Sequence, residues 1–130
     1  MIRVQSYDAY RRDIRLLVSS RSEDMNACIC SEEPAELIQA ISKVRRFRAG
    51  DESVGTQENV LDALKEEIAD VLICIDILKV MYGLPDDEID NMILKKNARN
   101  MQRLAKSARS SMPLKAMAAA HECCGGRCID

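Results

Sequence analysis

The segment "QENVLDALKEEIADVLICIDILKVMY", residues 57–82, is the longest regular pattern in the sequence and decides the fold class. Its apolar residues recur every three or four positions, as on an α-helix, and Gly83 follows as a stop signal. A helical wheel places apolar side chains on one broad side and on much of the opposite side. The broad side holds Val60, Leu64, Ile68, Val71, Leu72, Ile75 and Leu78, and the opposite side holds Ile73, Ile77, Val80 and Met81. A helix that is apolar nearly all round is surrounded by protein, so we expect other helices to cover residues 57–82.

Three more helical patterns flank this segment. We expect one helix over about residues 6–21, one that contains residues 30–41 and ends near Phe47, and one from about 86 to 106. Thr56 is a suitable N-cap for the helix at 57–82. No stretch alternates apolar and polar residues over the length of a strand. The sequence therefore predicts an all-α fold, a four-helix-type bundle.

The same pattern bears on oligomeric state. Four helices within 130 residues rarely enclose one of their own completely. We therefore expect a second copy of the chain to cover part of residues 57–82, in a homodimer or homotetramer. The alternative is a monomer in which the N-terminal helix and the C-terminal tail cover the second side.

Composition narrows the classes of partner. Apolar residues make up 47% and charged residues 31% of the chain, and 19 basic against 21 acidic residues give a net charge of −2. This balance gives no general reason to bind nucleic acid or an anionic membrane. No apolar run is long enough to span a bilayer, and the N-terminus lacks an apolar export signal, so we expect a cytoplasmic protein. In that setting Cys28, Cys30 and Cys74 are expected to be buried thiols.

The sequence changes character after residue 106. We predict a helical domain over residues 1–106 and a flexible or loosely packed cysteine-rich appendix over 107–130, which contains a proline, a run of small residues and a cysteine-glycine end. His121, Cys123, Cys124 and Cys128 are of zinc-ligand types, but their spacing is not that of a standard zinc site. We therefore favour an appendix over a metal site.

Acidic pairs occur at helical spacing on two of the expected helices. Glu33 and Glu36 are three positions apart beside one apolar stripe, and Glu67 and Asp70 repeat the spacing beside another. If the two helices pack antiparallel, four carboxylates converge at the edge of the core. Such a cluster is unfavourable without a cation, because like charges repel and burial adds a desolvation cost. Oxygen ligands favour Mg²⁺, with Mn²⁺ as a substitute, although acidic pairs also occur on plain solvated helix faces.

The acidic pairs belong to three longer motifs. "SEEPAELIQAISKVRRF", "EEIADVLICIDILKVMYGL" and "ILKKNARNMQR" together resemble the MazG-like all-α nucleoside triphosphate pyrophosphohydrolases over roughly residues 22–105. The signature of that family is EExxE followed by ExxD, with a later helix in the pattern KxxxNxxR. EExxE corresponds here to Glu32, Glu33 and Glu36, ExxD to Glu67 and Asp70, and KxxxNxxR to Lys96, Asn100 and Arg103.

The resemblance implies Mg²⁺-dependent cleavage of a nucleoside triphosphate into a monophosphate and pyrophosphate, as in housecleaning of the nucleotide pool. Glu33, Glu36, Glu67 and Asp70 would bind the metal, and Glu32 would lie behind them or orient the attacking water. Lys96, Asn100 and Arg103 would bind the substrate phosphates, with Lys43 as a weaker candidate. Asn26 and Phe47 are weak candidates for contact with the base or sugar.

Other readings stay open at this point. A dUTPase or a phosphoribosyl-ATP pyrophosphohydrolase has a similar motif, and a helical interaction module would keep the helices without needing the acids. A di-iron carboxylate bundle would need Glu-x-x-His pairs, which the sequence lacks. Pro34 lies inside EExxE: it either bends a continuous helix or occupies the first turn of a new helix capped by Ser31.

Overall fold

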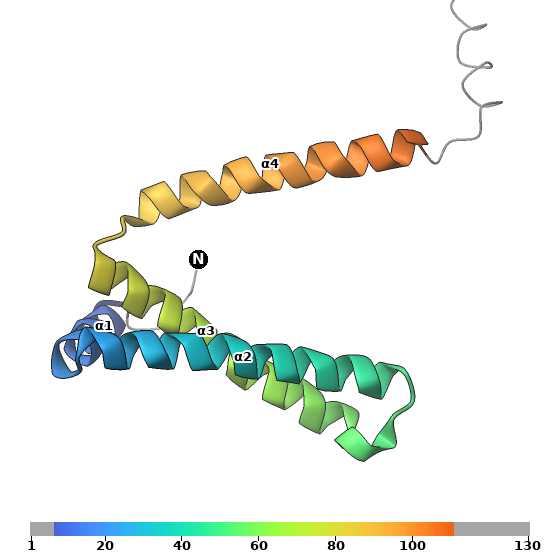
Figure 1. The fold of residues 1–130 in the computed structure, drawn as a ribbon, viewed down its shortest axis with the longest axis horizontal. Coiled ribbons are helices and arrows are strands. Elements are labelled where there is room, and N and C mark those ends of the chain that lie inside the picture. Colours follow the sequence, from blue (N-terminus) through green and yellow to red (C-terminus); the bar gives the residue numbers. More distant parts are fainter. Residues whose placement is uncertain (1–6, 111–130) are drawn as a thin grey trace, which may run out of the picture. The chain divides into compact units, whose positions relative to one another are not determined.

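The computed structural model describes residues 7–110, and every element within that range is helical. The chain forms α1 (Tyr7–Ser20), α2 (Glu23–Arg48), the short 3-10 helix η1 (Glu52–Val54), α3 (Gln57–Tyr82) and α4 (Asp86–Ser110) (Figure 1). The predicted all-α class with four helices is therefore confirmed for the described residues. By its internal contacts the chain divides into two units, one of residues 1–86 and one of residues 87–130.

Capping residues explain where the helices of the first unit begin and end. The Ser22 hydroxyl accepts a hydrogen bond from the Met25 amide at 3.1 Å, and the Thr56 hydroxyl accepts one from the Asn59 amide at 3.2 Å, so each caps the helix that follows. Gly83 ends α3 with a left-handed φ of 63°, which a residue without a Cβ adopts at no steric cost. The predicted bounds of α3 and its Thr56 cap are confirmed. Within the described residues, α4 continues to Ser110 rather than ending near 106.

Pro34 lies inside α2, which continues through it from Glu23 to Arg48. The alternative in which Ser31 caps a new helix is wrong, because the Ser31 hydroxyl donates to the Ala27 carbonyl at 2.7 Å within the same helix. Pro34 has no N–H to donate to the Cys30 carbonyl, and α2 is helical on both sides of this missing bond. The acidic motif therefore lies on one unbroken helix.

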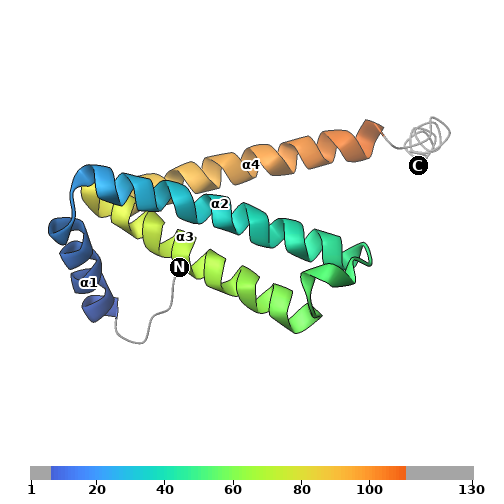
Figure 2. The ribbon, with the colours of Figure 1, turned by 60° about the horizontal axis from the view of Figure 1, so that its bottom comes forward.

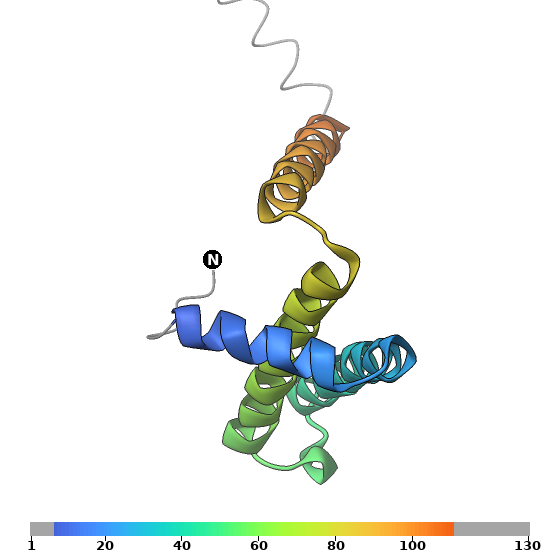
Figure 3. The same ribbon diagram turned by 90° about the vertical axis from the view of Figure 1, so that its left-hand side faces the viewer.

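Helices α2 and α3 run side by side and antiparallel, and α1 crosses α3 (Figures 2 and 3). Asp51 stabilises the turn between α2 and α3. Its carboxylate accepts a hydrogen bond from the Arg46 guanidinium at 2.8 Å and one from the Ser53 amide at 3.0 Å. The Ser53 hydroxyl also donates to Asp51, and this hydrogen bond, followed by those from Arg46 and the Ser53 amide, holds the pKa of Asp51 below its ordinary value. The braced turn fixes the register in which the two long helices meet.

The core of the first unit lies where α1, α2 and α3 meet. Its buried members are Ile14, Cys30, Cys74 and Ile77. The Cys30 thiol lies 3.6 Å from the Cys74 carbonyl oxygen, and burial is the main reason that the pKa of Cys74 rises to about 12. Cys30 and Cys74 are thus buried thiols, as predicted. The prediction is wrong for Cys28, which is exposed because it lies two positions from Cys30 and so about 200° around α2.

Apolar side chains also lie on the surface of the chain. Ile68, Leu72 and Ile75 of α3 are 38–44% exposed, and Ile38 and Ile41 of α2 are 63% and 44% exposed. The described residues therefore leave part of α3 uncovered, and its cover by a second copy of the chain or by the C-terminal tail stays a prediction. None of the described helices is both long enough and apolar enough to cross a lipid bilayer.

Candidate metal centre

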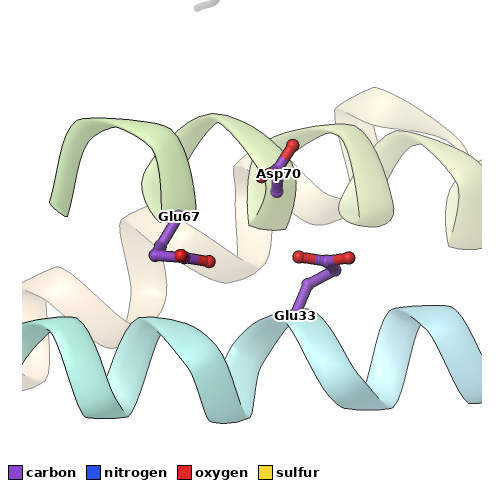
Figure 4. A group of neighbouring side chains, drawn as sticks. All are labelled: Glu33, Glu67 and Asp70. Atoms are coloured by element: carbon purple, nitrogen blue, oxygen red, sulfur yellow. The ribbon is translucent and has the colours of Figure 1, made fainter. Parts of the chain in front are cut away.

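Three carboxylates meet between α2 and α3. One carboxylate oxygen from each of Glu33, Glu67 and Asp70 lies within 4.8 Å of the other two. Glu33 reaches from α2 and Glu67 from α3 into the space between the helices, and Asp70 lies one turn further along α3 (Figure 4). The antiparallel packing brings them together, because residues 33 and 67 face each other across the same interface that joins Cys30 to Cys74.

The electrostatics of this acidic cluster are unfavourable. Burial, followed by the charges of Asp70, Glu36 and Glu67, raises the pKa of Glu33 above its ordinary value. Burial and the charge of Glu36 also raise the pKa of Glu67, with Asp70 adding to the effect. Both shifts show that the negative form is penalised where these side chains lie. The cluster would therefore gain from a cation.

A buried carboxylate oxygen lacks any hydrogen-bond partner. Oε2 of Glu67 is fully shielded from solvent, and no described donor reaches it. A buried acceptor of this kind normally has a partner, because desolvation without one costs free energy. An oxygen-preferring divalent ion such as Mg²⁺ would supply that partner, so the donor set fits a hard metal ion. Acidic groups also cluster in proteins without binding metal.

The other predicted acidic residues lie close by on α2. Glu36 is exposed and is not among the three converging carboxylates, yet its charge is the largest electrostatic influence on Glu67. Glu32 is exposed and adds a smaller charge effect at Glu33. Three of the four predicted ligands thus converge in the structure, and a metal-binding role for Glu36 stays a prediction.

Lys43 is the basic side chain that acts on this cluster from α2. Its charge lowers the pKa of Glu67, against the other influences on that group. Phe47 is half-buried, 14 residues beyond Glu33 on the same helix and so about 21 Å along the axis. The structure therefore brings Lys43, but not Phe47, toward the acidic cluster.

Asn26 has a structural role that the sequence did not indicate. It is 1% exposed, and its side-chain amide donates to the Val18 carbonyl at 3.3 Å, which ties α2 to the end of α1. No surface of the side chain is open to a base or sugar, so the structure does not favour the predicted contact. No local feature of the sequence marks this packing role.

Lys96, Asn100 and Arg103 lie on α4, in the second unit, and all three are exposed. Their i, i+4, i+7 spacing places them on one face of that helix. Their role in binding phosphate stays a prediction. The cysteine-rich segment with His121, Cys123, Cys124 and Cys128 lies outside the described residues.

Sequence reasoning missed a second polar group, on the side of α3 that faces α1. The Tyr10 hydroxyl donates to Oδ2 of Asp76 at 2.8 Å, and the Lys79 ammonium pairs with Asp76 at 3.2 Å and with Asp86 at 3.0 Å. Burial and the Asp76 hydrogen bond raise the pKa of Tyr10. The i, i+3 pair of Asp76 and Lys79 within an apolar helix was the available signal.

Comparison with known proteins adds no relative: no protein-family model, no curated protein and no solved structure matches this chain. The resemblance to the MazG-like pyrophosphohydrolases thus rests on the motifs alone.

Proposed function

We propose that this chain is a Mg²⁺-dependent nucleoside triphosphate pyrophosphohydrolase that cleaves (d)NTPs to (d)NMPs and pyrophosphate. The convergence of Glu33, Glu67 and Asp70, with carboxylate oxygens within 4.8 Å of one another, carries this proposal. The unpartnered buried oxygen of Glu67 and the raised pKa values of Glu33 and Glu67 support it independently of the motif. A dUTPase or phosphoribosyl-ATP pyrophosphohydrolase would use the same cluster and differ in substrate.

Each part of the cluster has a distinct task under this proposal. Glu33, Glu67 and Asp70 would hold Mg²⁺, with Mn²⁺ as a substitute, and Glu36 would add a fourth carboxylate. Bound there, the ion would neutralise phosphate charge and lower the pKa of a coordinated water. Glu32 is exposed one position before Glu33, where it can accept a proton from a water at the edge of the cluster.

Basic residues would bind the polyphosphate. Among these basic residues, Lys43 is the one whose charge acts on the acidic cluster, since it lowers the pKa of Glu67. Lys96, Asn100 and Arg103 share one face of α4 and offer an ammonium, an amide and a guanidinium, which suit phosphate oxygens. We assign these four residues to the substrate side of the site.

A second copy of the chain is part of the proposal. Ile68, Leu72 and Ile75 lie on one side of α3 at 44%, 38% and 41% exposure, and apolar surface of this kind favours association. We propose a homodimer or homotetramer built on this face. The same observation favours the second candidate function, a helical interaction module in which the acids have no catalytic task.

The decisive assay measures pyrophosphate release with Mg²⁺ across canonical and modified NTPs and dNTPs. Glu36→Ala and Asp70→Ala should each reduce the rate by about 10²-fold or more, since loss of a ligand or of its support removes metal from the site. Asp62→Ala is the matched control, because Asp62 is an exposed acid of α3 paired with Lys65, outside the cluster. If neither the parent chain nor the control releases pyrophosphate from any nucleotide, the result would instead favour the interaction module.

A further inference from the structure

A cavity of about 340 Å³ lies between α1 and the C-terminal end of α3, on the side of α3 away from the acidic cluster. Its volume falls in the range of small-molecule sites. Asp76, in its wall, lies six residues beyond Asp70 and so about 9 Å further along α3, on a different face. The cavity is therefore a separate candidate site that the proposed reaction does not use.

Most polar groups in this cavity already have partners. The Tyr10 hydroxyl donates a hydrogen bond to Asp76. The Lys79 ammonium forms ion pairs with Asp76 at 3.2 Å and with Asp86 at 3.0 Å. Burial opposes the charge on Lys79, but hydrogen bonds from its ammonium to Asp86 and Asp76 outweigh this and raise its pKa. The two acids and Lys79 thus form a closed set that offers an incoming ligand little.

Two guanidinium groups of the same cavity remain available. Arg11 and Arg15 both line it, and among the described residues neither has a carboxylate oxygen within 4.0 Å. They are four residues apart on α1, so they lie one turn apart on the same face. The Arg11 guanidinium also lies over the Tyr7 ring, 5.5 Å from the ring centroid, and this cation–π contact holds the Arg11 side chain against Tyr7.

The remaining wall is apolar. Ile14, which is 3% exposed, lines the cavity between the two arginines on α1, and Val80, Leu84 and Pro85 line the opposite side. Val80 and Leu84 are 42% and 43% exposed, so apolar surface is left uncovered beside free guanidinium groups. Such a wall suits a ring or a short hydrocarbon body.

From this arrangement we propose that the cavity between α1 and α3 binds a small phosphate monoester with an aromatic or apolar body. Two guanidinium groups one turn apart match a phosphate dianion, which accepts several hydrogen bonds from both, better than a carboxylate, which one guanidinium satisfies. The phosphate lies against Arg11 and Arg15, and the organic body lies against Val80, Leu84 and Pro85. Three basic side chains against two acidic ones leave the lining positive, as an anion requires.

The test is an NMR titration of the full chain with phenyl phosphate in EDTA-containing buffer, which keeps divalent ions from the acidic cluster. We expect amide shifts in α1 and around residues 76–86, and binding at least tenfold weaker in Arg11→Gln/Arg15→Gln. Arg12→Gln is the matched control, since Arg12 is an exposed arginine of α1 outside the lining, and its affinity should stay within twofold of the parent. Circular dichroism verifies that each variant is folded.

Two further probes test the chemistry of the ligand. Inorganic phosphate should bind several-fold more weakly than phenyl phosphate, because it lacks the body that meets the apolar wall, and benzoate should bind more weakly because it carries a single charge. Equal affinity of the parent and the double variant, equal loss in Arg12→Gln, or no saturable shift below about 10 mM phenyl phosphate would overturn the proposal. None of these outcomes depends on pyrophosphatase activity.

Discussion

The two sides of α3 hold carboxylates in opposite ways. On the side facing α1, both oxygens of Asp76 have partners, the Tyr10 hydroxyl at 2.8 Å and the Lys79 ammonium at 3.2 Å. On the side facing α2, Glu33, Glu67 and Asp70 come together without a hydrogen bond or ion pair to any described residue, and one oxygen of Glu67 is buried. The first group is completed by the protein itself. We propose that a cation from outside the chain completes the second.

The largest expected change in stability comes from breaking the completed group. Asp76→Ala removes the acceptor of Tyr10 and one of the two partners of Lys79, so it should lower the free energy of unfolding by about 2 kcal/mol. Chemical denaturation measures this. Asp62→Ala is the control, because Asp62 makes the same i, i+3 pair with Lys65 but with 54% and 75% of the side chains exposed, and should cost less than about 0.5 kcal/mol. Equal losses in both variants would show that the partly buried partners of Asp76 contribute nothing extra.

A smaller loss of stability is expected when the tyrosine hydroxyl alone is removed. Tyr10→Phe keeps the ring against the core and removes only the hydroxyl that donates to Asp76, so we expect a loss of about 1 kcal/mol. Tyr82→Phe is the control, since Tyr82 is 52% exposed and its hydroxyl has no described partner. Thermal unfolding of the two variants side by side measures the difference. A neutral Tyr10→Phe would mean that the hydrogen bond does not hold α1 on α3.

Removing a charge from the acidic cluster should raise the stability of the chain, and only slightly. Glu67→Gln in metal-free buffer should stabilise the chain at pH 7, because it removes a charge that burial and Glu36 disfavour. The pKa of Glu67 is raised in the folded state above the ordinary 4.5, so the folded state retains a proton that the unfolded state releases, and stability falls as pH rises from 4.5 through the folded pKa.

The gain of Glu67→Gln over the parent should therefore be full at neutral pH and shrink as the pH approaches 4.5. Melting temperatures at several pH values in EDTA measure it. Glu58→Gln, an exposed acid in the first turn of the same helix, should show no such gain. Loss of stability at neutral pH in Glu67→Gln would contradict the view that this carboxylate lacks a partner.

The contrast between the two groups also explains what the sequence could predict. Periodicity and caps located α3 from Gln57 to Tyr82, because its apolar repeat, Thr56 and Gly83 act locally. The i, i+3 spacing predicted that Glu67 and Asp70 share one face of their helix, since helix geometry fixes that relation. Convergence with Glu33 and Glu36 was predicted only on the condition that the two helices pack antiparallel, and Glu33 is the one of these two that joins the three converging carboxylates. Local rules therefore sufficed for α3 and for the pairing of Glu67 with Asp70, whereas their approach to Glu33 depends on how α2 packs on α3.

Features that depend on tertiary packing were not predictable in this way. The burial of Asn26 and the bond from Tyr10 to Asp76 join residues of different helices, and the hydrogen bond to Asp76 spans 66 positions along the chain. Pro34 was ambiguous because its local cost favours a break, whereas contact of α2 with α3 keeps the helix continuous. The packing of α1 and α2 on α3 decides these features, and no local pattern encodes that packing.

The most direct test of the account is the melting temperature of the chain with and without Mg²⁺, measured for the parent, Glu67→Gln and Asp76→Asn. Mg²⁺ at about 100 times its Kd should add about 2.7 kcal/mol to the parent and raise its melting temperature by several degrees. Asp76→Asn should melt lower but show the same rise, whereas Glu67→Gln should show little or none. No rise in the parent, or an equal rise in Glu67→Gln, would contradict a cation site between α2 and α3.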